Sequence, residues 1–152
     1  MENKRVTLTK FQVESWKQIY GIQDVRYGGL VLGNRHTEGS IESGVKILIP
    51  IDAETFGCAE IEGGEYLICP EATKKYRKRL DEINQYTDPC DEISEDRIKK
   101  LFSVIRPKSS MEMLLLSRGD YYIIRRSATS KYLEELDKMN ELCIKDSLIN
   151  KK

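Results

Sequence analysis

An internal near-repeat constrains the fold of this chain more than any other feature of its sequence. The segment EGGEYLICPEATKKYRKRLDEIN is similar to SRGDYYIIRRSATSKYLEELDKMN further along the chain, with one inserted residue. Matched positions include threonine, aspartate and asparagine, which a generic strand-then-helix pattern does not demand. The pairs include Gly64 with Gly119, Tyr66 with Tyr121, Ile68 with Ile123, Thr73 with Thr129, Tyr76 with Tyr132, Leu80 with Leu136, Asp81 with Asp137 and Asn84 with Asn140. A repeat of this kind predicts a duplicated structural unit.

Each copy is expected to be a β-hairpin followed by a helix, over residues 58–84 and 112–140. In the first copy, Gly63 and Gly64 supply the positive-φ positions that a two-residue hairpin turn favours. That turn would place Cys58 opposite Cys69 and Glu62 opposite Glu65 across the hairpin. The second hairpin is expected between residues 112 and 125.

The remaining elements complete an α+β fold. Thr9 and Gln12 have the spacing of a capping box, which predicts an amphipathic helix ending near Gly21. Strands are expected over residues 27–32 and in the stretch GVKILIPID. We therefore predict antiparallel β-hairpins with an N-terminal helix and two helices on one sheet face, in a single domain over residues 1–145 with a C-terminal tail over 146–152.

Composition excludes several classes of partner. The chain has 25 Lys and Arg against 25 Asp and Glu, and no basic stripe interleaved with aromatics, so nucleic acid is not an expected partner. No apolar run approaches a membrane helix and no signal peptide is recognisable, which indicates a protein of the cytoplasm. The four cysteines, at positions 58, 69, 90 and 143, lack zinc-site spacing and are expected to be buried or idle reduced thiols. No metal or cofactor is expected.

A family resemblance is carried by the stretches GNRHTEGSI, AEIEGGEYLICPEAT and LDEIN. Over residues 27–84 the chain resembles a segment of phage tail tape-measure proteins and other large virus-encoded proteins, with a Gly-x-x-His-x-x-Gly stretch before Glu-x-Glu-Gly-Gly-Glu-Tyr. The resemblance implies a viral or mobile-element origin and a compact module for virion assembly or protein interaction. It implies a location in the virion or the cytoplasm of the infected cell, and it brings no catalytic mechanism.

The candidate binding residues are His36, Glu60, Glu62 and Glu65. The three glutamates fit the solvated side and tip of a hairpin. With the single histidine they also form a ligand set that could bind a divalent ion, beside which a glutamate could act as general base. No nucleophile motif accompanies them.

Three functions therefore stay open. The first is a non-catalytic virion or interaction module with a protein partner. The others are a phage-encoded inhibitor that binds a host protein or small ligand, and a metal-dependent hydrolase. The sequence also leaves homo-oligomerisation open.

Overall fold

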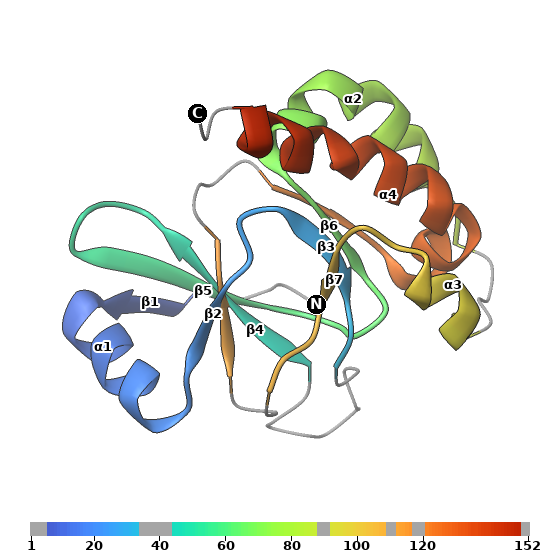
Figure 1. Cartoon of the computed structure of the whole chain (residues 1–152). Coiled ribbons are helices and arrows are strands. Elements are labelled where there is room, and N and C mark those ends of the chain that lie inside the picture. Colours follow the sequence, from blue (N-terminus) through green and yellow to red (C-terminus); the bar gives the residue numbers. More distant parts are fainter. Residues whose placement is uncertain (1–5, 34–43, 88–91, 109–111, 117–120, 150–152) are drawn as a thin grey trace. The chain divides into compact units, whose positions relative to one another are not determined.

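The fold is α+β, with helices and mixed sheets (Figure 1). The computed structural model describes residues 6–33, 44–87, 92–108, 112–116 and 121–149. The chain divides into two compact units that alternate along the sequence. Unit 1 comprises Met1–Arg26, Gly33–Gly63 and Arg106–Gly119, and unit 2 comprises Tyr27–Leu32, Gly64–Ile105 and Asp120–Lys152. The single domain expected over residues 1–145 stays a prediction.

Unit 1 is built on a five-stranded sheet with the strand order β1-β5-β4-β8-β2. Strand β5 pairs antiparallel with β1 and with β4, whereas β8 runs parallel to both β4 and β2. The elements of this unit are β1 (Val6–Thr9), α1 (Lys10–Ile19), β2 (Ile22–Asp24), β4 (Val45–Pro50), β5 (Thr55–Ile61) and β8 (Met113–Leu115).

The capping box predicted for the first helix is confirmed. The Thr9 hydroxyl oxygen accepts a hydrogen bond from the Gln12 backbone N–H at 3.2 Å, and the Gln12 side chain accepts one from the Thr9 N–H at 2.8 Å. These bonds satisfy donors that the first helical turn leaves without partners. Helix α1 then packs on the sheet through Val13, which is buried with Leu48 and Met113.

Unit 2 is built on a four-stranded sheet with the strand order β7-β3-β6-β9. Two helices, α2 and α4, lie side by side against this sheet (Figure 1). The elements are β3 (Gly28–Val31), β6 (Tyr66–Ile68), α2 (Pro70–Ile83), α3 (Glu95–Lys99), β7 (Val104–Ile105), β9 (Tyr122–Ile124) and α4 (Arg126–Ile149). Helix α4 thus continues past residue 145, into the segment predicted to be a tail.

The core of unit 2 lies between its sheet and the two long helices. All three residues of the central strand β6 are fully buried, and so are apolar side chains along both helices. The cluster includes Leu30, Tyr66, Ile68, Ala72, Leu80, Ile83, Ile124, Ala128, Leu133 and Leu136. Leu80 and Leu136, a matched pair of the near-repeat, are therefore core residues in both helices.

Both predicted hairpins are wrong. Strand β5 belongs to the five-stranded sheet and β6 to the four-stranded sheet, so Cys58 does not face Cys69 across a ladder. Likewise, β8 and β9 lie in different sheets. Gly63 is required because a side chain there would overlap the backbone carbonyl of Gly33, and Gly64 has a φ of 99°. The glycine pair therefore connects two sheets, each of which recruits its strands from distant parts of the chain.

Candidate functional site

Two strand–helix segments of unit 2, β6–α2 and β9–α4, correspond at a constant offset of 56 positions. Strands β6 and β9 pair antiparallel, with Tyr66 opposite Ile124, Leu67 opposite Ile123 and Ile68 opposite Tyr122. The middle pair therefore lies on an approximate two-fold axis. This correspondence needs no inserted residue, because Tyr66 matches Tyr122 and not Tyr121. Because neither predicted hairpin forms, the duplication of a whole hairpin–helix unit is not confirmed, and the correspondence is limited to these two strand–helix segments.

A tyrosine on each strand bonds to an aspartate on the helix of the other segment. The Tyr66 hydroxyl donates to Asp137 at 2.8 Å, and the Tyr122 hydroxyl donates to Asp81 at 2.6 Å. The first pair is buried, and Asp137 also accepts from the backbone N–H of Phe102 at 2.9 Å. Burial, together with the Asp137 carboxylate, raises the pKa of Tyr66 well above its usual value.

Two asparagines, Asn84 at the C-cap of α2 and Asn140 within α4, also bond across to the other segment. The Asn140 side-chain oxygen accepts from the backbone N–H of Cys69, and that of Asn84 accepts from the backbone N–H of Arg125, both at 2.8 Å. Each asparagine thus satisfies a backbone donor at the start of the other segment's helix. Because the two side chains make equivalent bonds, both positions are asparagine.

The two helices also share their local irregularities. Thr73 and Thr129 each donate a hydroxyl hydrogen bond to the carbonyl five residues earlier. Tyr76 and Tyr132 interrupt the helical backbone at equivalent positions, with φ and ψ of −112° and 17° in one and −111° and 21° in the other. The matching threonine bonds and backbone angles indicate that identical residues in the two segments adopt the same local conformation.

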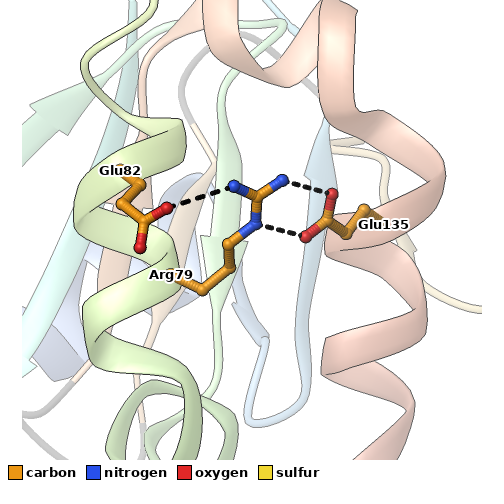
Figure 2. A network of polar contacts seen from close by, with 3 residues as sticks. All are labelled: Arg79, Glu82 and Glu135. Atoms are coloured by element: carbon orange, nitrogen blue, oxygen red, sulfur yellow. Dashed lines mark hydrogen bonds and ion pairs between the residues drawn. The ribbon is translucent and has the colours of Figure 1, made fainter.

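An ion pair joins the two helices, and its two residues occupy equivalent positions in the two segments. Arg79 and Glu135 are 56 residues apart, and the guanidinium donates to both carboxylate oxygens at 2.7 and 3.0 Å (Figure 2). Arg79 also reaches Glu82 at 3.4 Å. The hydrogen bond from Arg79 lowers the pKa of Glu135. Because the Arg79 and Glu135 side chains are about two-fifths exposed, at 42% and 38%, this network orients the helices more than it stabilises them.

One cluster of reactive side chains, Cys69, Cys143 and Glu71, has no counterpart at the corresponding positions of the two segments. Cys69 and Cys143 form a disulfide with a Cα–Cα separation of 6.6 Å, and the Glu71 carboxylate lies 3.1 Å from the Cys143 sulfur. The expectation of idle reduced thiols is therefore wrong for this pair. Cys58 is a free, half-buried thiol in β5 whose pKa is raised by burial, and Cys90 lies outside the described residues.

Sequence reasoning missed this cluster because its members are far apart in the chain. The disulfide joins residues separated by 74 positions, so no local sequence spacing predicts it. The one local signal is Cys-x-Glu at the start of α2. A helix N-terminus stabilises the negative charge of both a thiolate and a carboxylate.

The predicted binding residues lie partly outside the described residues and partly in each of the two units. His36 lies outside the described residues. Glu60 lies in β5 opposite Lys46, and Glu62 is half-buried just after that strand in unit 1. Glu65 precedes β6 in unit 2, where its backbone carbonyl accepts a hydrogen bond from Val31. Because neighbouring like charges in a sheet are destabilising, the position of Lys46 opposite Glu60 offsets the negative charge there.

Unit 1 exposes large apolar side chains on α1 and on the loop beside it. Phe11 is 79% exposed and Ile19 is 69% exposed, although both belong to a helix of only ten residues. They lie eight positions apart, which places them along one side of the helix. Ile51, at 55% exposure, precedes the loop whose Glu54 carbonyl accepts from the Lys10 N–H at 2.9 Å. We call Phe11 and Ile19 the apolar surface.

No family model, curated protein or solved structure matches this chain. Among the described helices, none combines the length and the apolar character needed to cross a membrane.

Proposed function

We propose that this chain is a non-catalytic protein-interaction module whose apolar surface binds a protein partner. The observation that carries the proposal is the exposure of Phe11 and Ile19 on α1. Leaving large apolar side chains in water is unfavourable by about 25 cal/mol per Å² of apolar area. Covering them in a complex would recover that free energy.

The way α1 is held supports this proposal. The capping box fixes the helix start, and Val13 anchors the opposite side of the helix in the core of unit 1. Trp16 packs against Tyr20 with ring centroids 4.6 Å apart. The exposed side chains are therefore presented on a backbone that is already ordered, which reduces the entropy lost on binding.

The resemblance over residues 27–84 supports a partner in a virus or mobile element. On that basis the module acts in virion assembly, and an inhibitor of a host protein is the alternative. Cofractionation of the protein with purified particles supports the assembly role. Capture of one host protein by the free chain, without association with particles, supports the inhibitor.

The proposal is tested by capture from the native host with a tagged chain. The double variant Phe11→Ser with Ile19→Ser removes the exposed apolar groups, and the double variant Lys17→Ser with Gln18→Ser is the matched control on exposed positions of the same helix. We expect one protein to be captured by the wild type and the control and to be lost with the apolar-surface variant. Equal capture by all three proteins would contradict the proposal.

A further inference from the structure

Three metal-ligating side chains meet in unit 2 at the N-terminus of α2. The ligand atoms of Cys69, Glu71 and Cys143 all lie within 4.8 Å of one another, and within the described residues they form a group able to hold a metal ion. Thiolates and carboxylates bind zinc at about 2.3 Å and 2.0–2.2 Å, respectively. We propose that these three residues bind a thiophilic divalent cation such as zinc when the disulfide is reduced.

The backbone holds the ligands in place without a flexible loop. Cys69 is the N-cap residue of α2, and its N–H is bonded to Asn140 at 2.8 Å. Cys143 follows Asn140 by three positions, so both lie on the side of α4 that faces the start of α2. Glu71 belongs to the first turn of α2. Two packed helices therefore converge on one point.

The environment suits a bound cation. Cys69 is fully buried and Cys143 is 4% exposed, whereas Glu71 is half-buried. Two thiolates and a carboxylate so close together would repel one another, and a divalent cation offsets that negative charge. The partial exposure of Glu71 leaves a side of the site open, as expected for a zinc with three protein ligands and one water.

The internal correspondence shows that the fold does not require this cluster. At the matching positions the other segment has Arg125 for Cys69 and Ser127 for Glu71, and α2 ends at Ile83, before the position that would match Cys143. Yet the tyrosine, asparagine and threonine bonds described above recur in both segments. The three ligating residues are therefore an addition to a framework that is complete without them.

The chemistry couples the cation to the redox state. An external dithiol reduces the Cys69–Cys143 disulfide, transferring two electrons and two protons and becoming a disulfide itself. Zinc then displaces both thiol protons and forms two Zn–S bonds. Tetrahedral zinc with Zn–S bonds of about 2.3 Å holds two sulfurs about 3.8 Å apart. Oxidation by an external disulfide reverses these steps and releases the cation.

The test measures zinc binding by the full chain in both redox states. Zinc is titrated into protein reduced with a dithiol and then freed of it, and into oxidised protein, with bound metal measured after gel filtration. Variants Cys143→Ser and Glu71→Gln remove ligands, while Cys58→Ser and Glu82→Gln are controls elsewhere in the chain. Cobalt replaces zinc in a parallel titration, because thiolate-to-cobalt charge-transfer absorption reports sulfur ligation directly.

We expect one zinc per reduced chain and none in the oxidised chain. Glu71→Gln should weaken binding at least about tenfold, Cys143→Ser should abolish the cobalt–thiolate absorption, and both controls should bind as the wild type does. Absence of zinc binding by the reduced wild type would overturn the proposal, even if Cys143→Ser fails to fold. Equal binding by the oxidised protein, or loss of binding in Cys58→Ser, would also overturn it.

Discussion

Tyr66 donates its phenolic hydrogen to Asp137 across 2.8 Å in the core of unit 2. The same bond recurs near the surface between Tyr122 and Asp81. The two bonds join the same chemical groups at corresponding positions but differ in burial. They therefore offer a comparison, within one protein, of what burial adds to a hydrogen bond.

Replacing the two tyrosines should have unequal effects on stability. Tyr66→Phe leaves one oxygen of the buried Asp137 without its donor, which should lower the free energy of unfolding by about 2 to 3 kcal/mol. Tyr122→Phe removes a bond beside solvent and should lower it by less than about 1 kcal/mol. Urea unfolding of the two variants measures both values. Equal losses of unfolding free energy in the two variants would show that burial does not determine how much the Tyr66–Asp137 bond contributes to stability.

Stability at alkaline pH should depend on Tyr66. Its pKa in the folded protein is raised well above its ordinary value, so the folded state retains a proton that the unfolded state releases from about pH 10. This contribution is complete below pH 10 and is lost as the pH rises towards the folded pKa. Wild type should therefore lose more stability than Tyr66→Phe between pH 9 and pH 11 in urea unfolding. A parallel decline of the two proteins would contradict this assignment.

The buried leucines of the two helices should be equivalent in energy as well as position. Leu80 and Leu136 are both fully buried, and truncation of either to alanine should lower the free energy of unfolding by about 2 to 5 kcal/mol. Lys78→Ala, on the exposed side of α2, should change it by less than about 0.5 kcal/mol. Chemical denaturation measures all three variants. A loss below 1 kcal/mol for one leucine alone would break the equivalence.

The ion pair in Figure 2 should give a small, salt-sensitive coupling. A double-mutant cycle on Arg79→Gln and Glu135→Gln should yield about 0.5 to 1 kcal/mol at low salt and less in 1 M salt. Because the pKa of Glu135 is lowered, its contribution is present above the unfolded value of about 4.3 and is lost as the pH falls through the folded value.

A matched cycle on Arg77 and Asp81, which are 3.8 Å apart on one helix, should give a smaller coupling. A coupling for Arg79 and Glu135 that does not respond to salt would contradict a solvent-screened pair.

Local signals in the sequence predicted the local structure well. The Thr9 and Gln12 capping box marked the start of α1. The strands predicted over residues 27–32 and in the stretch GVKILIPID correspond to β3 and β4. Each of these features depends on residues close together in the chain, which is why the sequence reveals them.

Strand pairing could not be predicted because it is decided by distant residues. Gly63 and Gly64 fit a hairpin turn locally, but β5 pairs with β1 and β4, while β6 pairs with β3 and β9. The Cys69–Cys143 disulfide spans 74 positions and was hidden for the same reason. The near-repeat revealed which helices correspond, but the constant offset of 56 became visible only through the pairing of Tyr66 with Ile124.

The most direct test of the proposed interaction is the affinity of the captured partner for the apolar surface. Isothermal titration calorimetry would compare wild type, Phe11→Ser and the control Gln18→Ser, with circular dichroism confirming that α1 is intact. We predict that Phe11→Ser weakens binding at least about tenfold, or about 1.4 kcal/mol, and that Gln18→Ser has no effect. Unchanged affinity in Phe11→Ser, with the helix folded, would contradict the proposed function.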